Sequence, residues 1–211
     1  MLGDTYPAPI EQVMTPVDQA LLRQRRHRLL QQARGRVLEL GGAGGVNLVH
    51  YAAAQVTEVV VLGPDAQGRI RLERAAARLP LTVTVRGPDE LDGGFDTVVA
   101  AFTLSARTDV EADVRLLAPL LGPDGRLLFI DHSPRRPLGR TVELSRPLWR
   151  LAAGGFVPGR DLPAAIRNGG FTILSIERFG LATLTLPLRS CVAGMARSQR
   201  PHGARRAKGE R

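Results

Sequence analysis

A short strand, a glycine-rich turn and an apolar segment follow one another directly, and together they constrain the fold of this chain more than any other feature. Residues 36–40 (RVLEL) are mostly aliphatic, and glycine occupies four of the next five positions, 41 to 45. An apolar segment with helical character follows over residues 46–54. Glycine accepts positive φ and lets another molecule lie against the backbone. The N–H groups at a helix start attract an anionic or oxygen-rich ligand. The stretch predicts a nucleotide-type cofactor site at the edge of an α/β sheet.

Strand-like and helix-like segments alternate along most of the remaining chain. The patterns predict strands over 56–62, 81–86, 95–101 and 125–130, and helices over 15–34, 65–79 and 108–121. A short helix capped by Asp161 comes next, and then two strands, 171–179 and 189–196, which we expect to pair as an antiparallel edge. Alternation of this kind predicts an α/β, doubly wound, mainly parallel sheet of seven strands with an antiparallel final strand.

Local signals predict where these helices begin and which faces they bury. Thr15 before Pro16 has the pattern of an N-cap, and residues 108–111 (TDVE) have that of a capping box. In the first helix Leu22, Leu29, Leu30 and Ala33 form the expected core stripe, and Arg23, Arg25, Arg26 and Arg28 the expected solvated face. A position over the cofactor is the alternative for those arginines. In the helix over 65–79 we expect Ile70, Ala76 and Ala77 to point inward.

Composition predicts one domain with two appendages. The 211 residues divide into a flexible arm (1–14), a domain (15–196) and a basic disordered tail (197–211) that carries five of the nine net positive charges. Only one of the 29 basic residues is lysine and only 4% of residues are aromatic, so nucleic-acid binding is disfavoured. No segment has the roughly 20 apolar residues of a membrane span, and no signal peptide is visible, so we expect a cytoplasmic protein. The single Cys191 excludes an internal disulfide.

The carboxyl ends of four predicted strands are the expected binding site. In an open parallel sheet, ligands bind beyond those ends, where the strand order reverses. The ends are residues 41–45, 63–65, 100–104 and 131–133. Topology alone predicts that they meet.

Several of these segments resemble the class I S-adenosylmethionine (SAM) dependent methyltransferases. Residues 37–45 (VLELGGAGG) are similar to the first motif of that family, and the similarity continues in 94–99 (GFDTVV), 117–128 (LAPLLGPDGRLL) and 168–171 (NGGF). It extends over residues 20–196. The nearest similarity is to small ubiquinone/menaquinone-type and thiol-methylating enzymes, through Asn47 and Tyr51, the pair Asp131-His132 and the pair Arg160-Asp161. The resemblance implies a Rossmann-like fold and SAM as cofactor.

The resemblance also implies roles for individual residues. Glu39 would orient either the methionine amino group or the glycine turn, and Asp89 would lie near the adenine. Phe102 would lie near the methyl group. His132, beside Asp131, would either take a proton from an oxygen or nitrogen acceptor or serve as a hydrogen-bonding group behind the site. The set implied as cofactor-binding is Glu39, Gly41, Gly42, Ala43, Gly45, Asn47, Asp65, Asp89 and Phe102.

Three positions depart from the family pattern. Ala43 replaces the middle glycine of the turn, and Gly63 stands where an acid usually holds the ribose hydroxyls. Asp65 either substitutes for that acid or caps the following helix. The loop 87–94 is short. The prediction is therefore a methyltransferase acting by in-line transfer on a small, apolar acceptor, with residues 133–160 as a possible acceptor lid. A non-catalytic SAM-fold binding or scaffold protein is the alternative.

Other site classes fit less well. A dinucleotide-binding G-x-G-x-x-G pattern fails because Asn47 occupies its third glycine position. No G-x-S-x-G is present for a hydrolase, and Cys191 falls within a predicted strand. The four histidines are scattered along the sequence, so no metal is expected. The sequence identifies neither the acceptor nor the oligomeric state.

Overall fold

The structure is a computed structural model, and it describes residues 15–134, 159–182, 184 and 188–199. The predicted arm, most of the predicted lid (135–158) and the tail from residue 200 lie outside the described residues. So do Leu148, Trp149 and Phe156, for which the sequence leaves two roles open, an apolar wall for the acceptor or packing of an irregular segment in the core.

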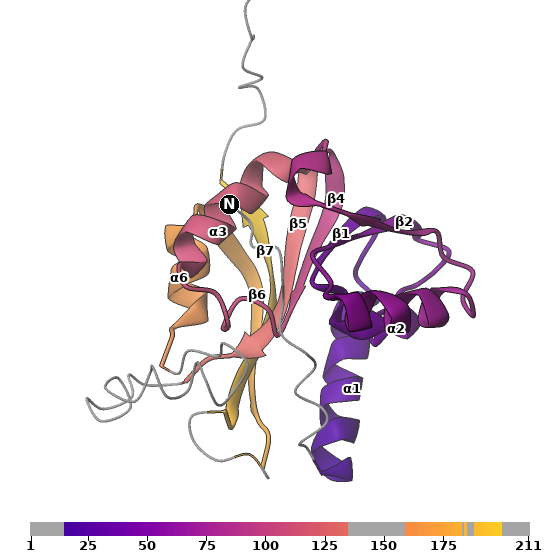
Figure 1. The fold of residues 1–211 in the computed structure, drawn as a ribbon. Coiled ribbons are helices and arrows are strands. Elements are labelled where there is room, and N and C mark those ends of the chain that lie inside the picture. The colour runs from indigo at the N-terminus through magenta and orange to yellow at the C-terminus, as the bar shows by residue number, and fades with distance from the viewer. Residues whose placement is uncertain (1–14, 135–158, 183, 185–187, 200–211) are drawn as a thin grey trace, which may run out of the picture.

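Seven strands form one mixed sheet in the order β3-β2-β1-β4-β5-β7-β6. Strands β1 to β5 pair in parallel, and β7 is antiparallel to both β5 and β6. The predicted α/β architecture with its antiparallel closing strand is thus confirmed (Figure 1). The strands are β1 (Gly35–Leu40), β2 (Val56–Leu62), β3 (Val83–Arg86), β4 (Phe95–Ala101), β5 (Leu121–His132), β6 (Phe171–Gly180) and β7 (Ser190–Ser198).

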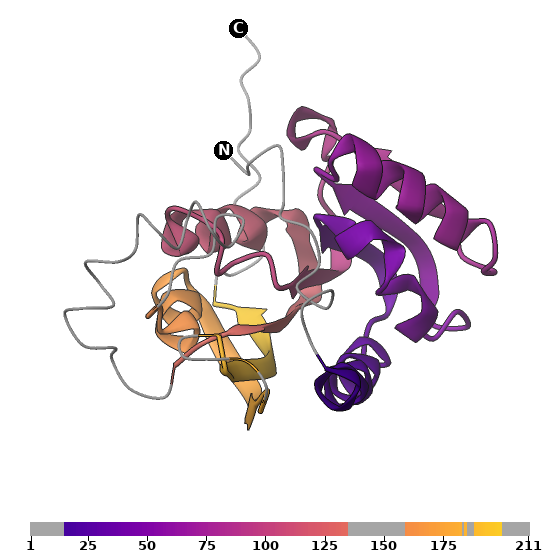
Figure 2. The same ribbon diagram turned by 60° about the horizontal axis from the view of Figure 1, so that its bottom comes forward.

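Helices cover both faces of the sheet, as Figures 1 and 2 show. Their bounds are α1 (Pro16–Leu30), α2 (Ala66–Ala76), α3 (Val110–Leu117) and α6 (Leu162–Asn168). One core cluster joins α3 and α6 to the sheet, and a second joins α1 and α2 to its other face. Alternate residues of the central strands enter opposite clusters: Leu38 and Val60 face α3 and α6, whereas Val37 and Val59 face α1 and α2. Both faces of these strands are buried, which explains their continuous aliphatic sequences.

The apolar segment after the glycine turn is not the α-helix that its sequence predicts. Two 3₁₀ turns, η2 (Gly42–Gly45) and η3 (Leu48–His50), occupy the region instead, and Tyr51 is extended at φ −71° and ψ 142°. Gly41, Gly42, Gly44 and Gly45 all have positive φ. Val46 and Asn47 have right-handed helical angles, but the chain is extended again at Tyr51, so only the short turn η3 forms in the apolar segment.

Helix ends and faces differ from the prediction in smaller ways. Helix α3 begins one residue late, because Asp109 and not Thr108 is its N-cap, accepting from the N–H of Ala112 at 2.9 Å. In α2 Leu72 is buried and the predicted Ala76 packs against the core partly buried, whereas Ile70 is 49% exposed and Ala77 is also exposed. In α1 the core stripe is confirmed, but Arg26 is buried together with it, whereas Arg23, Arg25 and Arg28 are less buried or exposed.

Across the part of the chain that the structure describes, no helix is both long and apolar enough to cross a membrane.

Candidate functional site

The strand order reverses between β1 and β4, and this is where the structure brings the predicted strand ends together. Strand β1 pairs with β2 on one side and with β4 on the other, so that Glu39 lies between Val61 and Val99 in the register. The segments that follow β1, β2, β4 and β5 therefore leave the same edge of the sheet. In doubly wound sheets, this reversal opens a crevice for ligands.

Glu39 is fully buried at the end of β1 and receives hydrogen bonds from two side chains. Asn47 Nδ2 donates to Oε1 at 2.7 Å, and the Tyr51 hydroxyl donates to Oε2 at 2.7 Å. Burial raises the pKa of Glu39, while the two hydrogen bonds and the charge of Arg26 on α1 act in the opposite direction. Burial also raises the pKa of Tyr51 well above its usual value, so the phenol remains a proton donor.

The sequence leaves two roles open for Glu39, which would orient either the methionine amino group or the glycine turn. The carboxylate is 0% exposed, and both of its oxygens accept from residues that follow the glycine turn. These two contacts hold the segment that follows the turn. Tyr51 belongs to this cluster but was not among the predicted site residues; its spacing after Asn47 was the sequence signal.

The glycines of the turn are required by their conformation and by the closeness of β2 and α2. A Cβ on Gly42 would lie 2.5 Å from Val61 Cγ1, and one on Gly45 would lie 2.7 Å from the Cβ of Ala75. A Cβ on Gly44 would lie 2.8 Å from Arg71 Nε. A side chain at Gly45 would push α2 away from the turn, and one at Gly42 would collide with β2. Ala43 lies within η2, between these glycines.

Asp65 and Asp89, which the sequence predicts near the ribose and the adenine, follow β2 and β3. Gly63 follows β2 with φ +66°, and Asp65 caps α2 by accepting from the N–H of Gly68 at 2.5 Å. The capping role considered for Asp65 is therefore present in the structure. Asp89 is exposed in the 3₁₀ turn η4 (Pro88–Glu90), which follows β3.

Phe102 has the only positive φ, 55°, among non-glycine residues in the described part of the chain. It directly follows β4, and its N–H donates to the carbonyl of Ile130 at 2.8 Å. Its ring packs edge-on against the imidazole of His132, with 5.1 Å between ring centroids. An aromatic residue in this conformation is strained, and such strain clusters at functional sites.

Asp131 and His132 end β5 side by side and are both buried. The Asp131 carboxylate accepts the backbone N–H of Ser105 at 3.0 Å and that of His132 at 2.7 Å, so it connects the loop after β4 to the end of β5. Burial raises the pKa of Asp131 to about 6. It lowers the pKa of His132 to about 4, which keeps the imidazole neutral at physiological pH.

Two buried side-chain oxygens along this edge have no hydrogen-bond partner within the described residues. They are Asn47 Oδ1 and Thr103 Oγ1, in side chains that are 1% and 3% exposed. A buried polar atom without a partner is costly unless a ligand or water satisfies it. SAM carries amino and hydroxyl groups that can satisfy such atoms, so these residues fit the cofactor that the sequence implies.

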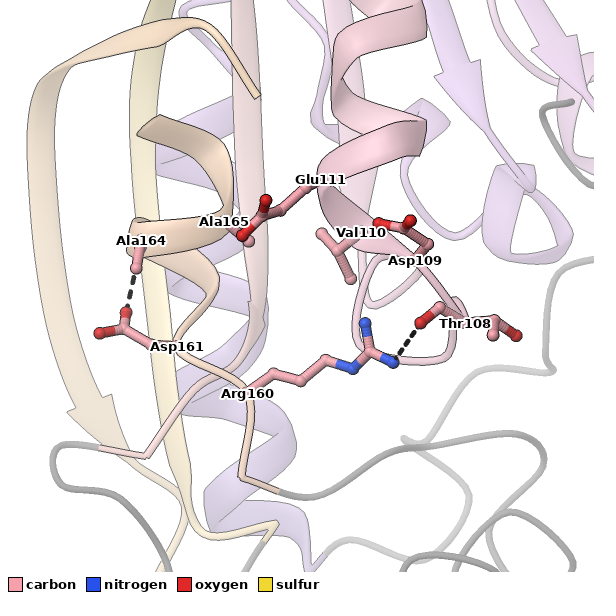
Figure 3. A pocket seen from close by; sticks show the side chains of 8 residues that line it. All are labelled: Thr108, Asp109, Val110, Glu111, Arg160, Asp161, Ala164 and Ala165. Atoms are coloured by element: carbon pink, nitrogen blue, oxygen red, sulfur yellow. Dashed lines mark hydrogen bonds between the residues drawn. The ribbon is translucent and has the colours of Figure 1, made fainter. Parts of the chain in front are cut away.

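A separate pocket of about 360 Å³ opens between the starts of α3 and α6 (Figure 3). Arg160 crosses it and donates to the carbonyl of Thr108 at 2.7 Å. Asp161 caps α6 through the N–H of Ala164 at 3.1 Å, as predicted. Arg160 and Asp161 thus both have structural partners beside this pocket. Its lining consists of Thr108, Asp109, Val110, Glu111, Arg160, Asp161, Ala164 and Ala165.

Comparison with known proteins agrees with this geometry. A family model described as a methyltransferase domain matches residues 17–176. The chain belongs to this methyltransferase family. The match confirms the predicted SAM-dependent methyltransferase, with SAM as its cofactor. It also includes every strand of the parallel part of the sheet, from β1 to β5.

Two curated relatives of this methyltransferase differ greatly in length. The chain is 28% identical over 162 residues to a ubiquinone biosynthesis O-methyltransferase of Xanthomonas euvesicatoria, which covers 70% of this chain and 67% of that protein. It is 34% identical over 110 residues to pyochelin synthetase PchE of Pseudomonas aeruginosa, covering 44% of this chain. The match spans only 8% of the synthetase.

Solved structures share the fold of this methyltransferase at low sequence identity. The N-methyltransferase NodS of Bradyrhizobium japonicum, in complex with S-adenosyl-L-homocysteine (SAH), has a TM-score of 0.66 at 16% identity, over 91% of this chain and 92% of that one. The [4+2]-cyclase SpnF has a TM-score of 0.65 at 16% identity, over 96% of this chain and 88% of that one. Proteins with different named reactions thus share this architecture.

Proposed function

We propose that this methyltransferase transfers the methyl group of SAM to a small, apolar acceptor at the edge where β1 and β4 diverge. The observation that carries the proposal is the Glu39 cluster, which fixes the segment after a glycine turn of positive φ at the reversal of the sheet. Such a turn presents backbone in place of side chains, and a flat adenosyl group requires that close approach.

The cofactor supplies an electrophilic methyl group on a sulfonium sulfur, and the chain has to position the acceptor in line with it. Positioning and exclusion of water can supply most of the rate in such a transfer. The turn 41–45, Asn47 and Thr103 would hold the cofactor, since two of their buried oxygens still have hydrogen-bonding capacity. Phe102, with its strained backbone, would face the methyl group.

His132 and Asp131 are assigned to the acceptor side. The neutral imidazole would accept the proton of an oxygen or nitrogen acceptor, with its ring held against Phe102. Asp131 would act through its neighbours, because both of its oxygens accept backbone N–H groups. The Xanthomonas relative is named as an O-methyltransferase, which favours an oxygen acceptor. The lid role of residues 133–160 stays a prediction, because most of them lie outside the described part.

A second candidate is a protein that binds SAM without transferring its methyl group. Gly63 lacks the carboxylate that the family places on the ribose, and the carboxylate of Asp65 caps α2 instead. SpnF, whose named activity is a cyclisation, has the same fold. Weak cofactor binding without methyl transfer would favour this candidate.

Calorimetry with SAM and with SAH, followed by transfer of labelled methyl groups to a panel of apolar phenols, amines and thiols, tests both candidates. We expect saturable binding of both nucleosides and transfer to at least one phenol. Gly94→Ala provides a control far from the turn, and it should bind like the wild type. If neither nucleoside binds at millimolar concentration, the enzyme proposal fails. Binding without transfer to any compound would support the non-catalytic candidate.

A further inference from the structure

Cys191 lies against His132 although the two residues are far apart in sequence. They are paired in the antiparallel register of β5 and β7, and Cys191 Sγ lies 3.4 Å from His132 Nδ1. Both side chains are almost fully buried, at 1% and 3% exposure. The sequence gives Cys191 only a core position within a strand. The structure places it beside the imidazole that the proposed function assigns to the acceptor.

The backbone carbonyl of Leu188 completes this group. Cys191 Sγ donates to this carbonyl over 4.0 Å. A carbonyl oxygen only accepts hydrogen bonds, so the thiol presents its hydrogen to it. Burial raises the pKa of the Cys191 thiol far above its usual value, so the sulfur keeps its hydrogen at neutral pH.

These constraints favour one direction for the hydrogen bonds. If the thiol hydrogen points to Leu188, the sulfur offers Nδ1 only its lone pairs, and Nδ1 must then carry the ring hydrogen. A neutral imidazole has one ring hydrogen, and a partner that accepts it at one nitrogen leaves the other nitrogen as a proton acceptor.

We propose that Cys191 is a positioning residue for His132, and that it holds the imidazole in the tautomer protonated at Nδ1, with Nε2 as the basic nitrogen. The sulfur accepts from Nδ1 while the thiol donates to Leu188, so β7 fixes both the orientation and the tautomer of a side chain on β5. The edge-on contact with Phe102 restricts rotation of the same ring. The proposal deepens the proposed function, since it names which nitrogen of His132 would receive the acceptor proton.

The tautomer can be measured without any acceptor. In protein labelled with ¹⁵N at histidine, two-bond correlations to the ring carbons distinguish a protonated Nδ1 from a protonated Nε2. With SAH present at pH 7.5, the wild type should show His132 protonated at Nδ1. Cys191→Ser, which retains a hydroxyl that accepts and donates, should keep this tautomer. Cys191→Val, which has no polar atom, should shift most of the His132 population to the Nε2-protonated form.

Control variants separate this role from packing. Val192→Ala removes buried volume at the next residue of β7, on the other face of the sheet, and should lower stability while leaving the His132 tautomer unchanged. A wild-type His132 protonated at Nε2, or an unchanged tautomer in Cys191→Val, would overturn the proposal. Failure of methyl transfer would contradict the proposed function alone, because the tautomer is read from the protein itself. Once an acceptor is known, Cys191→Val should lower kcat at least tenfold with little change in KM.

Discussion

The phenol hydroxyl of Tyr51 donates a 2.7 Å hydrogen bond to the carboxylate of Glu39, beneath the glycine turn. The bond joins the extended residue after η3 to the end of β1. Together with Asn47 it compensates part of the cost of burying an acid that is 0% exposed. Buried carboxylates are costly unless their lone pairs are satisfied. The two donors thus stabilise both the ionised acid and the turn above it.

Tyr51→Phe should therefore destabilise the fold and weaken cofactor binding together. Loss of one donor to a buried carboxylate costs about 1–3 kcal/mol, which urea unfolding monitored by circular dichroism can resolve. Glu39→Gln alone and the double variant complete a double-mutant cycle. A coupling energy below about 0.3 kcal/mol would mean that the two groups act independently, contrary to this account.

Much of the sheet could be predicted because its strands are buried on both faces. Residues 56–62 and 95–101 are predicted and observed with the same bounds, since a continuous aliphatic run between turn residues allows few alternatives. Prediction failed where backbone geometry overrides composition. Residues 46–54 are apolar enough for a helix, but the chain makes only the short turn η3 there and is extended at Tyr51. Arg26 is buried because α1 packs beside the Glu39 cluster, a tertiary contact that no local pattern reveals.

The site could be predicted only in part, for a related reason. Motif residues such as Glu39, Asn47 and His132 do lie at strand ends on one edge of the sheet. Their partners come from elsewhere: Cys191 meets His132 only through the register of β5 and β7. The histidines are also scattered along the sequence, yet in the fold the rings of His27 on α1 and His50 on η3 lie 5.7 Å apart. Contacts between distant elements depend on register, which sequence patterns do not specify.

Gly45→Ala should be more damaging than Gly94→Ala, although both residues have positive φ, +86° and +73°. The left-handed conformation costs about 1–2 kcal/mol for either alanine. Only at Gly45 would the new Cβ also meet α2, at 2.7 Å from Ala75, whereas it finds nothing within 4 Å at Gly94. We expect an additional loss of about 1–3 kcal/mol at Gly45, from overpacking, together with loss of SAH binding. Equal unfolding free energies for the two variants would show that α2 does not restrict the turn.

Phe102→Ala should reduce turnover more than stability. The ring is only half-buried, so its removal should cost about 1–2 kcal/mol of unfolding free energy. Loss of the edge-on contact frees the His132 ring beside the proposed methyl position, and a small misplacement there can cost on the order of 100-fold in rate. Phe102→Leu, which keeps most of the volume, is the control for packing. If the alanine variant unfolds easily but retains kcat, the role of Phe102 is structural.

Acidification should destabilise the protein through His132 and stabilise it through Asp131, in overlapping pH ranges. Burial lowers the pKa of His132 from 6.5 to about 4. Its contribution to the unfolding free energy is therefore complete above pH 6.5 and is lost as the pH falls towards 4. This shift in the pKa of His132 corresponds to at most about 3 kcal/mol of unfolding free energy. Burial raises the pKa of Asp131 from 3.8 to about 6. Its contribution to the unfolding free energy is therefore complete below pH 3.8 and is lost as the pH rises through 6.

Two variants separate these opposing effects. His132→Asn removes the imidazole, so between pH 7 and 4 the wild type should lose unfolding free energy relative to this variant. Asp131→Asn keeps an oxygen that accepts the N–H of Ser105 but removes the charge, so over the same range the wild type should gain relative to it. Urea titrations at half-unit pH steps measure both differences. His50, whose pKa burial and the charge of Arg26 lower to about 4, remains in both variants and cancels from each comparison. Slopes of the same sign for the two variants would contradict the assignment, because an acid and a base with oppositely shifted pKa values cannot respond alike to protons.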